Sequence, residues 1–138
     1  MKAQDILDAI NGEIIYLTDN EALDNEYEYG FATDLMSDAL ALIQENETST
    51  VLITGLANIQ SVNTADMLDI SLIIFVRDKQ LADDVISHAK NHNISLFKSG
   101  CSMYQVCGML YEKGLGSIDV NCLSWRIYSY KKWLYRRR

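Results

Sequence analysis

The chain of 138 residues contains no proline and only three cysteines, an odd number. An average composition would include about 5% proline, so the turns of this chain must depend on Gly, Asn, Asp and Ser. An odd number of cysteines fits reduced thiols better than a disulfide framework. A run of about 18 apolar residues is also lacking, which predicts no membrane-spanning helix. The acids in the opening MKAQDILDAINGEII do not fit a signal peptide. We therefore expect a cytoplasmic protein.

The charge is unevenly distributed along the chain. Residues 117–138 contain six Lys or Arg and one acid, whereas residues 1–116 contain six bases and eighteen acids. An acidic body repels the phosphate backbone, which disfavours nucleic acid as a partner. The basic, aromatic tail can dock onto its own subunit, onto a second copy or onto another protein. Contact of the tail with an anionic membrane surface is a less favoured alternative.

Apolar spacing predicts an alternation of strands and helices. Short apolar runs typical of strands occupy residues 13–18, 49–55, 70–76 and 94–97. Helical spacing is found in residues 4–11, 32–46, 58–69, 78–93 and 101–114, and Thr33 or Asp34 is expected to cap the second of these helices. We therefore predict a three-layer α/β fold in a single domain, residues 1–116, with a mainly parallel sheet flanked by helices. Residues 117–138 would form a C-terminal extension.

Polar residues follow three of the predicted strands, where ligands bind in open α/β sheets. Backbone N–H groups and the helix dipole at a strand-to-helix junction suit a small anion, and an Arg after the central strand could meet a phosphate or carboxylate. The candidate ligand-binding residues are Thr54, Gly55, Asn58, Ser61, Arg77, Ser99, Gly100 and Ser102. For Ser99 and Ser102 helix capping is the alternative role, and for Arg77 it is a solvated surface position.

The residues that could carry other chemistry give weaker patterns. Cys101 and Cys107 are six positions apart, which is the spacing of neither a zinc site nor a Cys-x-x-Cys pair. A thiol enzyme using Cys101 is kept as an alternative, although no histidine is nearby in sequence. His88 and His92 have a metal-capable spacing without a third ligand. We predict no metal and no cofactor.

Three segments resemble small stand-alone proteins of the DRTGG family. They are GFATDLMSDAL, VLITGLANIQSVNTADMLDISLIIFV and AKNHNISLFKSGCSMYQVCGMLYEKGL, within residues 1–115. DRTGG domains also occur in phosphotransacetylases and between the CBS domains of regulated pyrophosphatases, and their fold is similar to the N-terminal domain of HPr kinase/phosphorylase. The sequence departs from the family at the motif that names it. FVRDK stands in place of Thr-Gly-Gly, so Arg77 would either block a ligand there or offer it a charge.

The resemblance implies a non-catalytic regulatory domain that senses a ligand or mediates dimerisation. A small anionic ligand, such as an adenine nucleotide, is the expected class, and we expect a homodimer. The alternative is a protein-interaction or scaffold subunit that acts through dimerisation and through its basic tail, residues 117–138.

Overall fold

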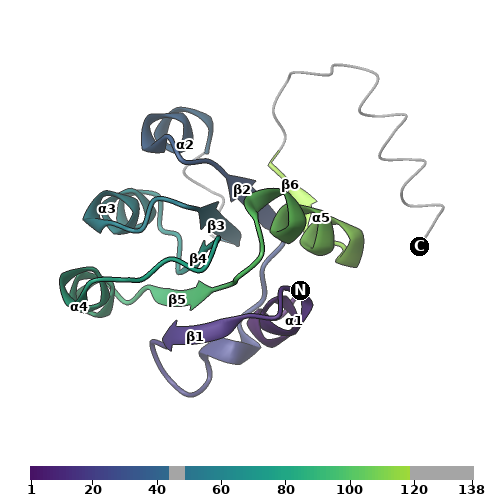
Figure 1. Cartoon of the computed structure of the whole chain (residues 1–138), viewed down its shortest axis with the longest axis horizontal. Coiled ribbons are helices and arrows are strands. Elements are labelled where there is room, and N and C mark those ends of the chain that lie inside the picture. Colours follow the sequence, from purple (N-terminus) through teal and green to yellow (C-terminus); the bar gives the residue numbers. More distant parts are fainter. Residues whose placement is uncertain (44–48, 119–138) are drawn as a thin grey trace.

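The computed structural model describes residues 1–43 and 49–118. A six-stranded sheet has the order β1-β5-β4-β3-β2-β6 (Figure 1). Its strands are β1 (Glu13–Tyr16), β2 (Tyr29–Ala32), β3 (Thr50–Thr54), β4 (Leu72–Phe75), β5 (Ser95–Lys98) and β6 (Gly116–Ser117). The described helices are α1 (Ala3–Ala9), the 3-10 helix η1 (Ala22–Asp24), α2 (Met36–Leu42), α3 (Ile59–Met67), α4 (Asp83–Asn91) and α5 (Met103–Lys113).

All neighbouring strands from β5 to β6 pair in parallel, and only β1 is antiparallel to its neighbour β5. The central strands β3 and β4 are buried at every position. Such continuous burial is expected of parallel strands that are covered on both faces. The predicted fold class, a three-layer α/β domain with a mainly parallel sheet, is therefore confirmed.

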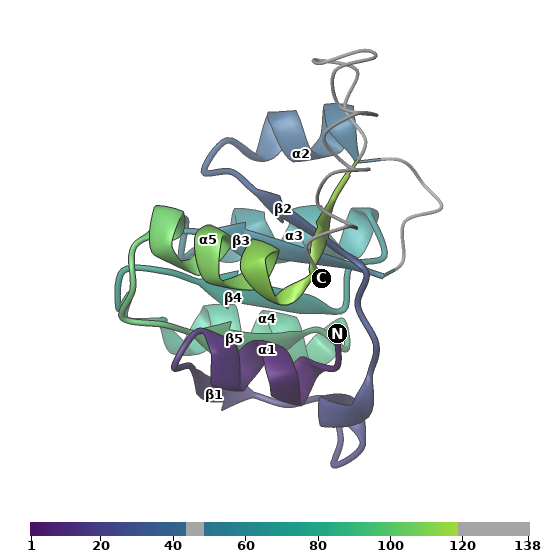
Figure 2. The same ribbon diagram turned by 90° about the vertical axis from the view of Figure 1, so that its right-hand side faces the viewer.

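Helices cover both faces of this sheet (Figure 1). Helices α2, α3 and α4 pack against one face, where strand residues such as Leu52, Ile73 and Phe75 point. Helices α1 and α5 lie side by side on the other face, over Ile53, Ile74 and their neighbours (Figure 2). Successive strand residues point to opposite faces, so each strand contributes to both cores. None of the described helices is long and apolar enough to traverse a lipid bilayer.

Local sequence signals fix both ends of α5. The Ser102 hydroxyl accepts the Gln105 N–H, and the Gln105 side chain accepts the Ser102 N–H, which together form a capping box. At the other end Gly114 has a φ of 109°, a left-handed conformation that favours glycine. The chain then turns directly into β6, which pairs with β2.

Helices α2 and α4 begin several residues later than their sequence patterns predict. Helix α4 begins at Asp83 and not near Asp78, because Arg77 and Asp78 both adopt positive φ angles, which a right-handed helix does not contain. The prediction that Thr33 or Asp34 caps α2 is wrong. The N-cap is Leu35, without a side-chain hydrogen bond, and Asp34 binds the neighbouring strand end instead. The division into residues 1–116 and a tail stays a prediction, since residues 119–138 lie outside the described residues.

Candidate functional site

The candidate site lies at the carboxyl edge of the parallel sheet, where three strand ends meet. Asp34 follows β2, Thr54 ends β3 with Gly55 directly after it, and Arg77 follows β4. Because β2, β3 and β4 are adjacent and parallel, their carboxyl ends are side by side. This is the edge at which open α/β sheets bind ligands.

The Asp34 carboxylate is the centre of this cluster. Its Oδ1 atom accepts the Gly55 N–H at 2.6 Å and the Thr54 hydroxyl at 3.3 Å. Its Oδ2 atom lies 3.2 Å from Nη2 of Arg77. Thr54 is buried, whereas the side chains of Asp34 and Arg77 are about half exposed, at 50% and 49%. A backbone amide, a hydroxyl and a guanidinium thus converge on one carboxylate at a solvent-accessible position.

The backbone after β4 directs Arg77 across this edge. Arg77 and Asp78 have φ angles of 65° and 52°, in the left-handed region that is unfavourable for residues with a Cβ atom. Hydrogen bonds hold the conformation, since Arg77 N–H donates to the Cys101 carbonyl at 2.9 Å and Asp78 N–H donates to the Ser99 carbonyl at 3.0 Å. The Arg77 side chain then lies over Gly55, where a Cβ atom would stand 1.9 Å from Nη2. Gly55 therefore leaves the space that the guanidinium occupies.

The loop between β5 and α5 is largely engaged with the protein itself. The Ser99 side chain is buried, and its hydroxyl donates to the Ile10 carbonyl at 2.7 Å while accepting the Cys101 N–H at 3.2 Å. Ser102 is occupied as the cap of α5. Gly100 is exposed, and a Cβ atom there would have no neighbour within 4 Å. Gly100 and Ser102 of this loop are thus exposed, but the Ser102 hydroxyl is already used by the helix cap.

The remaining candidates, Asn58 and Ser61, organise the start of α3. The Asn58 side chain accepts the Ser61 N–H at 3.4 Å, and the buried Ser61 hydroxyl donates to the Leu56 carbonyl at 2.5 Å. The structure thus brings Thr54, Gly55 and Arg77 together around Asp34. It gives Asn58, Ser61, Ser99 and Ser102 local hydrogen bonds that shape the surrounding loops.

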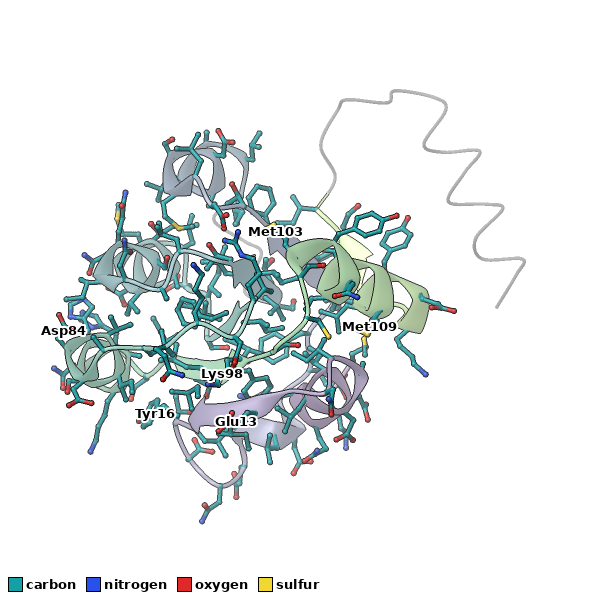
Figure 3. The ribbon with its side chains drawn as sticks, viewed as in Figure 1. Glu13, Tyr16, Asp84, Lys98, Met103 and Met109 are labelled. Atoms are coloured by element: carbon teal, nitrogen blue, oxygen red, sulfur yellow. The ribbon has the colours of Figure 1, made fainter. Side chains whose placement is uncertain are left out.

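A second basic group, Lys98, lies at the end of β5. Figure 3 shows it close to Glu13 of the neighbouring strand β1, and the Lys98 Nζ atom is 3.8 Å from the Glu13 carboxylate and 3.3 Å from that of Asp78. The Lys98 side chain is only 14% exposed, whereas both acids face solvent. Acidic side chains therefore accompany both basic groups, Lys98 and Arg77, at this edge.

Asp34 and Lys98 are the site residues that sequence reasoning missed. The sequence pattern predicts a helix-capping role for Asp34, and it gives Lys98 no role at the end of its strand, next to the candidates Ser99, Gly100 and Ser102. The available signal was position, because each residue closes or immediately follows a parallel strand at the same edge as Arg77. Their pairing with Arg77 and Asp78 required the strand order, which the sequence pattern alone does not specify.

The sulfur and imidazole groups lie apart from this edge cluster. Cys101 and Cys107 are free thiols, and burial raises the pKa of the Cys107 thiol, which opposes thiolate formation at neutral pH. The chain's only histidines are His88 on α4 and His92 at its C-cap, and α4 covers the opposite face of the sheet from α5. Among the residues that the structure describes, no group of three His, Cys, Asp or Glu could hold a metal ion.

An apolar hollow of about 200 Å³ lies between α5 and the strands β2, β3 and β6. Its lining comprises Gly30, Ala32, Ile53, Cys107, Leu110, Tyr111, Leu115, Gly116 and Ser117. Tyr104, also on α5, is not part of this lining and is 88% exposed. None of these described lining residues is charged, so they offer no group suited to binding an anion.

Comparison with known proteins gives a match by structure but not by sequence. No protein-family model matches the chain, and no curated protein matches it. Among solved structures, the CBS and DRTGG domains of the regulatory region of Clostridium perfringens pyrophosphatase, complexed with the activator diadenosine tetraphosphate, align with a TM-score of 0.61 and 15% identity. The match covers 86% of this chain and 50% of the other, so this chain spans about half the length of that protein. The chain therefore shares its α/β fold with a regulatory region that contains CBS and DRTGG domains.

Proposed function

We propose that this protein is a non-catalytic regulatory domain that senses a small anionic ligand at the carboxyl edge of its parallel sheet. The observation that carries the proposal is the convergence of the Gly55 N–H, the Thr54 hydroxyl and the Arg77 guanidinium on one carboxylate. These are the donors that proteins use for carboxylate and phosphate groups. The structurally similar pyrophosphatase region binds diadenosine tetraphosphate, which supports an adenine nucleotide as the ligand class.

The surroundings of Arg77 leave room for a ligand larger than a phosphate group. The loop of Gly100 is tied to the Arg77 backbone through the Cys101 carbonyl, and the space beside Gly100 is open. A nucleotide whose phosphate group meets Arg77 could therefore extend over Gly100. Asn58, at the start of α3, is a further polar group near the end of β3.

Regulation by this domain would require no chemical step. A ligand that binds one arrangement of the domain or its subunits better than another shifts the population toward it. A thiol reaction at Cys101 is disfavoured, because the chain's two histidines lie on α4 and at its C-cap, and a cysteine nucleophile needs an adjacent base or another activating group.

Thermal unfolding in the presence of nucleotides tests the proposal. Saturation at about 100 times Kd adds about 2.7 kcal/mol to the free energy of unfolding. ATP, ADP, AMP, diadenosine tetraphosphate and inorganic pyrophosphate would be compared on the wild type, on Arg77→Gln and on Lys79→Gln. The two variants lose the same charge two positions apart, but only Arg77 contacts the site. We expect a shift in Tm that Arg77→Gln abolishes and Lys79→Gln retains. No shift with any of these compounds, or equal losses in both variants, would contradict the proposal.

A second candidate function is self-association as an interaction or scaffold subunit, and the surface of α5 favours it. The segment from Ser99 to Tyr111 contains no charged residue, although 22% of the chain is charged. Tyr104 projects into solvent, and beside it on the same helix a Cβ atom at Gly108 would have no neighbour within 4 Å. In a two-fold pair of antiparallel α5 helices, Tyr104 of each copy could lie over Gly108 of the other.

Sedimentation velocity tests this second candidate. We expect a dimer for the wild type and a monomer for Tyr104→Glu, with Gln105→Glu as a control for added charge on the same helix. A monomeric wild type at micromolar concentration would eliminate self-association through α5. The basic tail, which was the other predicted contact for a protein partner, lies outside the described residues from position 119 onward.

A further inference from the structure

The acceptor in the edge cluster is a side chain of the protein itself. Asp34 places one carboxylate oxygen 2.6 Å from the Gly55 amide nitrogen and the other 3.2 Å from the Arg77 guanidinium. An external phosphate or carboxylate group would need the same donors. The site is therefore an oxyanion site that already contains an oxyanion.

Asp34 is not required in this position by the secondary structure around it. It lies between the end of β2 and the start of α2, and the N-cap of α2 is Leu35. Thr33 satisfies the local turn, because its hydroxyl accepts the Leu35 N–H at 3.0 Å and its own N–H donates to the Ile53 carbonyl at 3.0 Å. The Asp34 side chain is thus free to leave without removing a backbone hydrogen bond of β2 or a side-chain cap of α2.

We propose that Asp34 is a resident carboxylate that occupies the site of Gly55 and Arg77, and that an incoming phosphate or carboxylate group displaces it. This inference rests on the proposed function and adds its regulation. The side chains of Asp34 and Arg77 are both half exposed, so an anion can approach the pair from solvent. A salt bridge exposed to this extent is weak enough to be exchanged for an external ligand.

Displacement of Asp34 has a structural consequence for α2. This helix has seven residues and is joined to the sheet edge through Asp34 and Leu35. Its inner face packs through Met36, Ala39 and Ile43, while Leu40 and Leu42 are 41% and 43% exposed. Release of Asp34, which lies just before α2 begins, removes its polar contacts with Gly55 and Arg77 at the ends of β3 and β4. Ligand occupancy is thereby coupled to the mobility of α2 and of its exposed leucines.

Asp34 and an external anion compete for the same donors, so removing the Asp34 charge should raise the affinity for the anion. If Asp34 fills the site in about nine of ten molecules, the apparent affinity for an external anion is reduced about tenfold. Asp34→Asn keeps the shape of the side chain but removes its charge, so it should bind anions about tenfold more tightly than the wild type. Asp38→Asn is the matched control, because it removes the same charge from the exposed surface of α2 and has no contact with the site.

The experiment is a titration followed by the Gly55 amide signal in two-dimensional ¹H–¹⁵N NMR spectra. Inorganic pyrophosphate is the probe in one arm and succinate in the other, which distinguishes phosphate from carboxylate ligands. We expect tighter binding of at least one probe by Asp34→Asn and by Asp34→Ala, unchanged affinity for Asp38→Asn and no binding by Arg77→Gln. Hydrogen exchange of the α2 amides should be faster in the wild type saturated with the probe that binds.

The possible results of this titration distinguish failure of the Asp34 inference from failure of the proposed anion sensing. Equal affinities of the wild type, Asp34→Asn and Asp34→Ala would overturn the resident-carboxylate inference and leave anion sensing intact. Binding without faster exchange in α2 would overturn the coupling to that helix. Binding of neither probe by any of these proteins would overturn the proposed function as well.

Discussion

Substitution of Gly55 by alanine separates the structural role of this position from its role in binding. An added Cβ atom would stand 1.9 Å from Nη2 of Arg77 and 2.8 Å from its Cζ atom. Since comfortable contact requires about 3.5 Å, the guanidinium must retreat by roughly 1.6 Å. Such a shift outward would take the 3.2 Å contact with Asp34 beyond the range of an ion pair.

The stability of Gly55→Ala should change little, because two small effects oppose each other. Loss of a half-exposed ion pair costs at most about 1 kcal/mol. Replacing a glycine whose backbone an alanine can adopt stabilises the protein by about 0.4–1 kcal/mol through the unfolded chain. Gly55 is such a glycine, since Gly114 is the glycine with a positive φ in the described part of the chain. We expect the free energy of unfolding to stay within about 1 kcal/mol of wild type.

Anion binding by Gly55→Ala should fall much further than its stability. A hydrogen bond from a charged donor contributes about 1.5–3 kcal/mol, so its loss corresponds to at least a roughly tenfold weaker affinity. Urea unfolding and calorimetric titration with pyrophosphate measure the two quantities on the same samples. Wild-type affinity in Gly55→Ala would refute the role assigned to the Arg77 guanidinium. A loss of stability above about 2 kcal/mol would refute the assumption that Arg77 can move aside cheaply.

Three further predictions concern the frame that supports the site. Phe97→Ala should reduce the free energy of unfolding by about 3–5 kcal/mol in urea, because Phe97 is fully buried; a loss below about 1 kcal/mol would show that the core is wrongly assigned. Ser102→Ala should cost about 1 kcal/mol in the same assay through loss of the capping box, and no change would deny that role. Burial raises the pKa of Tyr27 above 10.0, so its contribution to stability is complete below pH 10 and is lost as pH rises through the folded-state pKa. Tyr27→Phe should therefore lose less stability above pH 10 than the wild type, and identical alkaline unfolding curves would contradict this.

The sequence predicts the fold well because the strongest patterns are those of the buried sheet. Residues 70–76 form a continuous apolar run, and the structure places β4 at the centre, buried on both faces. The strand β6 could not be predicted, since two residues carry no period. The antiparallel direction of β1 could not be predicted either, because the apolar run of residues 13–18 does not specify the strand with which it pairs.

The site is less predictable than the fold for a physical reason. Thr54, Gly55 and Arg77 could be proposed from strand ends alone. Their acceptor, Asp34, follows β2, a strand of four residues that is not among the strands predicted from apolar runs. An acidic residue that caps a helix and an acidic residue that occupies an anion site also look alike in sequence. In both roles the carboxylate accepts hydrogen bonds from free backbone N–H groups.

The pairing of β1 with β5 has a consequence for synthesis on the ribosome. Glu13 is matched to Lys98, so β1 is synthesised well before the residues of β5 with which it pairs. Until then the apolar side of α1, including Ile6 and Ile10, lacks the surface of α5 and β5 that covers it in the finished domain. While these apolar side chains are exposed, they can make non-native contacts, because their native partners are distant in sequence. A nascent chain halted before β5 should therefore be bound by chaperones.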